Sequence, residues 1–370
     1  MKITGVKTTL FRSASEPRAG GAQGFSATDP THACVVELAT DAGLAGVAIG
    51  NVAVAAQLRQ ITDELLVGED PRCVTALWQR MVTASDRSGQ GGFVRGAIAA
   101  LDVALWDLKA KANQEPLWKT LGGARPRVNA YASGLDVQAT DAALHVAVSA
   151  MAKQFGFRGG KLGVGPDPDA DLRRLGIIKQ ALLANTAEPE LMIAAGHYAS
   201  PKQAIRRVRE IEKHVDLTWV EEPARRWDFL GLKRVSNGIR SAVCAGGSLA
   251  APADFLPHFQ CHALDVVQVD AASVGITGAL QIADTAFGFE LPVTLSRSPG
   301  NMHAHLGAVM PYCMSMEVVD PVALGGVFTG DVRIESGWAV AGDRPGNGLV
   351  IDQEALAQAS GAAAVAGRVA

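Results

Sequence analysis

The sequence predicts an α/β protein with a closed parallel barrel preceded by a smaller α+β domain. Short β-type runs alternate with helical stretches from residue 128 onward, and eight such runs can be counted. The length points the same way, because 370 residues, 48% of them hydrophobic, exceed the usual single domain. An open doubly wound sheet would show the same alternation. No G-x-G-x-x-G motif follows the first strand, however, and a count of eight strands favours closure.

The N-terminal region has two kinds of pattern. Residues 3–11 and 33–39 alternate between apolar and polar side chains, which predicts two strands of a hairpin-like sheet. Residues 13–31 between them are rich in Gly, Ser and Ala, and a connection of this length is usually either a functional lid or disordered. From residue 54 to 121 the pattern becomes helical, with a tightly packing Ala-rich helix at 95–109.

The barrel elements follow one another in a regular order. The predicted strands span residues 128–132, 160–162, 191–194, 217–220, 242–245, 266–269, 292–295 and 315–318. The predicted helices between them include residues 169–185, 200–214, 275–287 and 301–309. Residues 333–350 read as turn-rich strands that return to the first domain. The expected domains are a capping domain at 1–125, a barrel at 126–325 and a returning C-terminal segment at 326–370.

Composition argues against several classes of function. The formal net charge is −3, from 34 basic and 37 acidic residues without a Lys/Arg run, so neither nucleic acid nor a membrane surface is an expected partner. The first residues alternate like a strand rather than a signal peptide, and there is no apolar run of 18 residues. Five scattered cysteines without a C-x-x-C pair indicate buried thiols. We therefore expect a cytoplasmic protein.

Chemistry in such barrels sits at the carboxyl ends of the strands, so the residues there are the candidate site. Taken from the second to the eighth strand, they are Lys161, Ala194, His197, Glu221, Gly247, Ser248, Asp270, Ser296, Arg297 and Glu317. The set mixes titratable side chains with residues that have no functional group.

Several segments resemble the enolase superfamily: residues 95–109 followed by 115–123, the strand end at 220–223, the strand at 268–270 and the tail at 344–348. The chain is most similar to the mandelate racemase and acid-sugar dehydratase branch, because Asp270 stands where the muconate-lactonizing branch would carry lysine. The resemblance implies a (β/α)7β TIM-type barrel and an α+β capping domain completed by the C-terminal tail. It also implies closing loops at 13–31 and at a turn at 50–51, and a homo-oligomer.

The resemblance also implies a magnesium ion held by carboxylates at the ends of strands three, four and five. Here Ala194, Glu221 and Gly247 stand at those places, so Glu221 alone could bind metal. Since Mg²⁺ needs several oxygen ligands in near-octahedral geometry, we expect no cofactor, or weak Mg²⁺ binding when a substrate supplies ligands. The family's second strand-two lysine is replaced by Gly163, and its strand-seven histidine aligns with Ser296.

Each remaining candidate has a structural alternative. Lys161 either covers the barrel mouth or acts in catalysis, Glu221 forms an ion pair or moves a proton, and Asp270 caps a helix or acts as a base. Arg297 either binds a substrate carboxylate or forms a surface salt bridge. His197, Ser248, Ser296 and Glu317 complete the predicted substrate site. His303 and His305, on the next helix, are expected to be packing residues.

The replacement of the implied metal ligands and catalytic residues suggests one hypothesis about charge. Lys161 and Glu221 both come from even-numbered strands, which contribute to the same side-chain layers, so the ammonium would replace the metal and lie within about 6 Å of the carboxylate. Two functions stay open. The first is a divergent lyase or isomerase that acts on a small carboxylate or acid sugar by α-proton chemistry, with Lys161, Asp270 and Glu221 as its catalytic residues. The second is a non-catalytic relative that binds a small acid or serves as an oligomeric scaffold.

Overall fold

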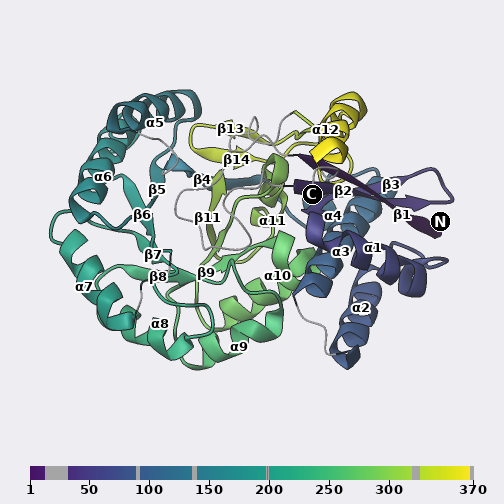
Figure 1. The fold of residues 1–370 in the computed structure, drawn as a ribbon, viewed down its shortest axis with the longest axis horizontal. Coiled ribbons are helices and arrows are strands. Elements are labelled where there is room, and N and C mark those ends of the chain that lie inside the picture. Colours follow the sequence, from purple (N-terminus) through teal and green to yellow (C-terminus); the bar gives the residue numbers. More distant parts are fainter. Residues whose placement is uncertain are drawn as a thin grey trace.

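The computed structural model describes residues 1–12, 32–88, 92–135, 140–196, 198, 200–318 and 326–366. An eight-stranded parallel barrel with outer helices lies beside a smaller capping region (Figure 1). The predicted lid at 13–31 and His197 lie outside the described residues.

The barrel confirms the predicted fold. Its strands run in chain order, and β11 pairs with β4 to close the sheet. The strands are β4 (Arg127–Ala132), β5 (Gly159–Gly163), β6 (Glu190–Ala194), β7 (Trp219–Glu221), β8 (Ala242–Ala245), β9 (Val266–Val269), β10 (Val293–Leu295) and β11 (Cys313–Val318). Every predicted strand is found within two residues of its expected bounds.

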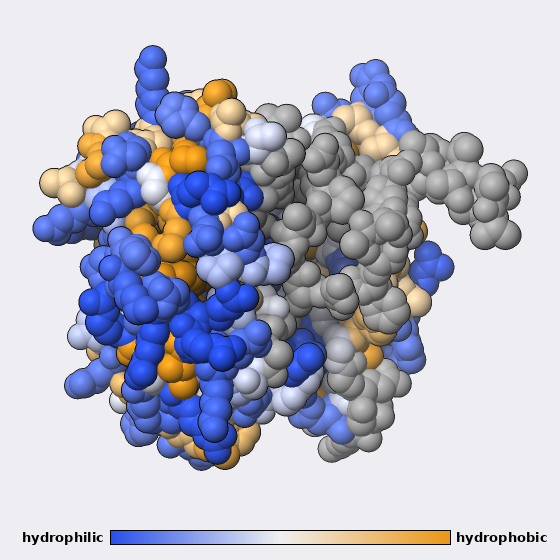
Figure 2. Space-filling view, turned by 60° about the vertical axis from the view of Figure 1, so that its left-hand side comes forward, coloured by the Kyte–Doolittle hydropathy of each residue, from blue (hydrophilic) through white to orange (hydrophobic). Residues whose placement is uncertain are grey.

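In the part of the chain that the structure describes, seven helices connect the strands and cover the outside of the barrel. They are α5 (Asp141–Phe155), α6 (Pro168–Leu182), α7 (Pro201–Ile211), α8 (Phe229–Ser236), α9 (Pro252–Gln260), α10 (Ala271–Gly288) and α11 (His303–Gly307). Several begin at side-chain caps: Thr140 accepts from the Ala143 N–H and Ser200 from the Gln203 N–H. The face over α5, α6 and α7 is mainly hydrophilic with separate hydrophobic areas (Figure 2), as expected where amphipathic helices face solvent.

The capping region is built on a three-stranded antiparallel sheet of β1 (Ile3–Arg12), β2 (His32–Thr40) and β3 (Ala45–Asn51). The third strand was not predicted, and the expected turn at 50–51 is wrong, because Gly50 and Asn51 pair with Cys34 and Ala33 at the end of β3. Its small residues Ala45, Gly46 and Gly50 gave little strand signal. A side chain at Gly46 would collide with the Ala104 carbonyl, so Gly allows this strand to lie against helix α3 (Phe93–Ala112).

The other helices of the capping region are α1 (Ala55–Ile61), α2 (Val74–Ser88) and α4 (Leu117–Thr120), together with the 3-10 turn η1 (Val52–Val54) and the π-helical turn η2 (Thr62–Leu66). The tail forms β12 (Phe328–Thr329), β13 (Arg333–Glu335), β14 (Trp338–Val340), β15 (Val350–Ile351) and α12 (Gln353–Ala366). β14 extends the barrel sheet beside β4, whereas α12 contacts β1 of the cap. The tail therefore contacts both regions. No helix in the described part is long and apolar enough to cross a membrane.

Candidate functional site

The strand ends bring Lys161 together with two carboxylates. Its Nζ donates to Glu221 Oε2 at 2.6 Å and to Glu317 Oε2 at 2.9 Å, and the Lys161 side chain is 7% exposed. The predicted proximity of Lys161 and Glu221 is therefore confirmed, while Glu317 as a second partner was not foreseen. The ammonium lies between two carboxylates at the carboxyl end of the barrel.

Gln268 completes a layer of four side chains. Its Nε2 donates to Glu221 Oε2 at 2.9 Å, the oxygen that also accepts from Lys161. These side chains come from β5, β7, β9 and β11, the even-numbered barrel strands, which is the layer arrangement known for such barrels. Ser133, directly after β4, donates its hydroxyl to Glu317 Oε1. Sequence reasoning missed the roles of Gln268 and Ser133, although the even-strand rule could have indicated Gln268.

Burial and mutual attraction set the charges of this layer. Burial alone would lower the pKa of Lys161, but Glu221 and Glu317 outweigh it and raise that pKa well above its ordinary value. The ammonium is therefore permanently charged near neutral pH and cannot accept a proton. Burial raises the pKa of Glu221, and the neighbouring ammonium opposes this rise in part. Glu221 can thus titrate nearer to neutrality than an ordinary glutamate.

One oxygen of Glu221 remains available. Lys161 and Gln268 both bind Oε2, whereas no described residue donates a hydrogen bond to Oε1, and the Glu221 side chain is 17% exposed. The next residue differs: Glu222 has a positive φ of 44° and accepts a hydrogen bond from the Ser248 hydroxyl. Ser248, predicted to bind substrate, is therefore occupied by Glu222 in this structure.

Asp270 caps the helix that follows its strand. Oδ1 accepts from the Ala272 N–H at 2.9 Å and Oδ2 from the Ser273 hydroxyl at 3.1 Å. This is the structural alternative given for Asp270, and it uses both oxygens. Because both carboxylate oxygens of Asp270 accept hydrogen bonds within the fold, the structure gives no support to its predicted catalytic role.

A histidine does lie beside Asp270, from an unexpected element. His303 begins α11, and its Nε2 is 3.8 Å from Asp270 Oδ1. Its Nδ1 donates to the Ser296 carbonyl at 2.6 Å, and Nε2 accepts from the Ala271 N–H at 3.2 Å, which fixes the neutral tautomer. Burial lowers the pKa of His303, in agreement with a neutral ring. The contact with Asp270 is thus no ion pair, and His303 packs and orients this corner, as expected.

The remaining candidates have limited structural support. Ser296 donates its hydroxyl to the Val269 carbonyl and its own carbonyl accepts from His303, so both its groups serve the backbone corner. Arg297 follows β10 and is half-buried. Its binding of a substrate carboxylate stays a prediction.

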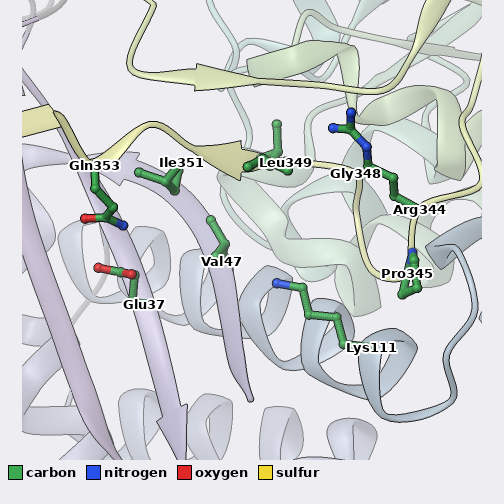
Figure 3. Close-up of a pocket in the computed structure, with 10 residues that line it drawn as sticks. Glu37, Val47, Lys111, Arg344, Pro345, Gly348, Leu349, Ile351 and Gln353 are labelled. Atoms are coloured by element: carbon green, nitrogen blue, oxygen red, sulfur yellow. The ribbon is translucent and has the colours of Figure 1, made fainter. Parts of the chain in front are cut away.

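A separate cavity of about 300 Å³ lies away from these residues. It is formed where the tail covers the capping sheet, and Glu37, Val47, Lys111 and Arg344 are among its lining residues (Figure 3). The Lys111 ammonium is already bound to Asp107 Oδ2 at 2.6 Å and to the Ala45 carbonyl at 2.9 Å. None of the predicted site residues lines this cavity, so it is not part of the strand-end site.

The closed (β/α)7β barrel, its capping region and a charged layer at the carboxyl strand ends define an enolase-type protein. Residues 143–355 match the family described as enolase C-terminal domain-like, and residues 13–122 match the mandelate racemase/muconate lactonizing enzyme N-terminal domain. The chain belongs to this enolase superfamily, in its mandelate racemase and acid-sugar dehydratase branch.

The similar proteins include lyases and isomerases. A 3,6-anhydro-alpha-L-galactonate cycloisomerase from Streptomyces coelicolor is 31% identical over 83% of this chain and 84% of its own length. An L-talarate/galactarate dehydratase from Salmonella typhimurium is 31% identical over 83% of this chain and 75% of its own. Among solved structures, an L-talarate dehydratase from a Polaromonas species, complexed with Mg and L-glucarate, has 28% identity and a TM-score of 0.83 over 96% of both chains.

At the position where the resemblance implies a magnesium ion, the described side chains supply one carboxylate, that of Glu221. Ala194 and Gly247, which end β6 and follow β8, offer no side-chain oxygen, and Glu221 Oε2 already binds an ammonium and an amide. A Cβ added at Gly247 would lie 2.4 Å from Gln268 Oε1, so Gln268 fills the space that a ligand side chain would need. Within the described residues, there is also no group of three or more His, Cys, Asp or Glu side chains able to hold a metal.

Proposed function

We propose that this protein binds a small carboxylate or acid sugar at the carboxyl end of its barrel and acts on it as a lyase or isomerase by α-proton transfer. One observation carries this proposal: Glu221 is held at Oε2 by Lys161 and Gln268, while Oε1 accepts no hydrogen bond from the described residues. The lyase and isomerase activities of similar proteins support the reaction class. A small carboxylate is the ligand that Arg297 at the barrel mouth suits.

Glu221 is the group that moves the proton in this proposal. The Cα–H bond of the substrate breaks, the proton passes to Glu221 Oε1, and the electron pair delocalises into the adjacent carboxylate. If the β-hydroxyl leaves with this proton as water, the product is dehydrated. If solvent water protonates the opposite face of Cα and Glu221 releases its proton to solvent, the product is an epimer or racemate. A carboxyl group whose pKa is raised toward neutrality suits both directions of proton transfer.

Lys161 does not carry the proton in this proposal. Because its pKa is raised and two carboxylates hold it, it serves as a fixed cation that keeps Glu221 in place. Fixed charges of this kind stabilise developing negative charge without reorganisation. Arg297 is the proposed partner of the substrate carboxylate. No step in this scheme passes through a metal ion.

The test is hydrogen–deuterium exchange at Cα, followed by NMR in D₂O with a panel of aldonic, aldaric and small hydroxy acids. Activity is expected to persist with a chelator, and Glu221→Gln is expected to slow exchange at least about 100-fold while ligand-induced thermal shifts remain. Glu210→Gln, an exposed glutamate on α7, is the matched control and should exchange like the wild type. Exchange that requires added magnesium, or an unaffected Glu221→Gln variant, would contradict the proposal.

A second function is favoured by the neighbouring residues. Both oxygens of Asp270 and both ring nitrogens of His303 are occupied by hydrogen bonds within the fold, so neither residue supplies a second acid–base group. A non-catalytic protein that binds a small acid, or serves as an oligomeric scaffold, fits this observation. It predicts thermal shifts with carboxylates but no exchange with any of them.

A further inference from the structure

The carboxylate oxygens of the strand-end layer are almost fully used by protein donors. Glu221 Oε2 accepts from the Lys161 ammonium at 2.6 Å and from the Gln268 amide at 2.9 Å. Glu317 accepts from Lys161 through Oε2 and from the Ser133 hydroxyl through Oε1. Glu221 Oε1 accepts no hydrogen bond from the described residues, but a metal ion that binds both carboxylates would have to displace the ammonium that joins them.

Gln268 also blocks the place from which a further ligand would come. A Cβ at Gly247 would stand 2.4 Å from Gln268 Oε1 and 3.0 Å from its Cδ, closer than real Cβ contacts. Gly247 has no positive φ, so its backbone would accept a side chain. The obstacle is therefore Gln268 itself, whose amide is held in place by its bond to Glu221.

We propose that Lys161 and Gln268 together occupy the place of a divalent cation, with Lys161 supplying the positive charge and Gln268 closing the space beside Gly247. The inference rests on the proposed function in that it concerns the same Glu221. These two side chains then decide whether the site binds a cation. Removing the ammonium would leave two carboxylates that a divalent cation could bridge, since such ions prefer carboxylate oxygen.

The direct test is binding of Mn²⁺, followed by electron paramagnetic resonance, with no substrate present. The wild type is expected to show no Mn²⁺ bound at this site, and Lys161→Ala is expected to bind Mn²⁺ at least about tenfold more tightly. Adding Glu221→Gln to Lys161→Ala should abolish the gain. Lys153→Ala, an exposed lysine on α5, is the matched control and should behave like the wild type. Wild-type Mn²⁺ binding that Glu221→Gln removes, or a folded Lys161→Ala without a gain, would overturn the proposal.

A stability cycle tests the role of Gln268 even if Lys161→Ala does not fold. Gly247→Ala should lower the melting temperature because its Cβ meets Gln268, and Gln268→Ala in the same chain should recover most of that loss. Additive effects of the two substitutions would contradict the steric role of Gln268. Neither readout uses turnover, so the proposed reaction can fail in the exchange assay while this inference holds, and the reverse.

Discussion

Two regions of this protein hold carboxylates in the interior, and the hydrogen-bond partners of these carboxylates differ between the regions. In the strand-end layer, Glu221 and Glu317 bind side chains, chief among them the Lys161 ammonium. On α3, Asp102 and Asp107 bind mainly backbone N–H groups from other parts of the chain. Both arrangements satisfy buried charge, but only the first leaves a partly exposed carboxylate at a strand end.

The α3 region joins the cap to the barrel. Asp102 accepts from the Thr277 N–H and hydroxyl, both at 2.7 Å, where α10 is kinked at Gly275 with a φ of 74°. A side chain at Gly275 would meet Asp102 Oδ2 at 2.7 Å, so this contact requires glycine. Asp107 accepts from the N–H groups of Val47 and Asn347, which belong to β3 and the tail. The carboxylates of α3 bind backbone donors and are therefore structural. In the strand-end layer the main donor is a side-chain ammonium, which another cation could replace.

The largest effect is expected when the ammonium is removed from the strand-end layer. Lys161→Met leaves two carboxylates facing each other without the cation between them, and we expect a loss of about 3–5 kcal/mol in the free energy of unfolding at neutral pH. Urea unfolding measures it. Lys153→Met on the exposed face of α5 should cost less than about 0.5 kcal/mol. A loss below about 1 kcal/mol for Lys161→Met would show that the strand-end layer is well solvated. The difference drawn between this layer and the α3 region would then be wrong.

Asp102→Ala is expected to have the next largest effect. It leaves the Thr277 N–H and hydroxyl without their acceptor in a fully buried place and opens a small cavity. We expect a loss of about 3 kcal/mol by chemical denaturation. Asp86→Ala, at an exposed side chain of α2, is the control. A near-neutral Asp102→Ala would mean that the cap and barrel are joined mainly by apolar packing.

The fold could be predicted from the sequence because most barrel strands contain a short apolar run that stops at small or charged residues. β3 was missed because small residues such as Ala45 and Gly46 carry little strand propensity, and their fit depends on helix α3. A local sequence pattern does not predict such contacts between distant segments.

The candidate site could be predicted in part. The Lys161–Glu221 contact follows from the even-strand layer rule, and the same rule extends to Gln268 and Glu317. The hydroxyl of Ser133 could not be assigned, because it lies after β4 and reaches Glu317 only through the register of β4 with β11. The neutral state of His303 likewise depends on contacts with Ser296 and Ala271 that only folding brings together.

The pH dependence of the free energy of unfolding should show the protonation of Asp102 on α3. Burial raises the pKa of Asp102 from 3.8 to about 7, so the native state holds a proton that the unfolded chain has released. Stability from this group is therefore present below about pH 4 and is lost as the pH rises toward 7. Relative to Asp102→Asn, the wild type should lose about 2 kcal/mol between pH 5 and pH 7. Parallel pH profiles of the two proteins would show that Asp102 is ionised throughout.

The smallest expected effect is the most direct check of the contrast, because it repeats the Lys→Met change in the other region. Lys111 binds Asp107 Oδ2 at 2.6 Å, yet Asp107 keeps the N–H groups of Val47 and Asn347 when the ammonium is removed. The Lys111 side chain is also 22% exposed, so solvent replaces part of what is lost. Lys111→Met should cost about 1 kcal/mol in urea unfolding, a fraction of the loss for Lys161→Met. Equal losses in the free energy of unfolding for the two lysine substitutions would mean that the backbone donors do not stabilise Asp107 once the ammonium is gone. The type of hydrogen-bond partner would then not distinguish the carboxylates of α3 from those of the strand-end layer.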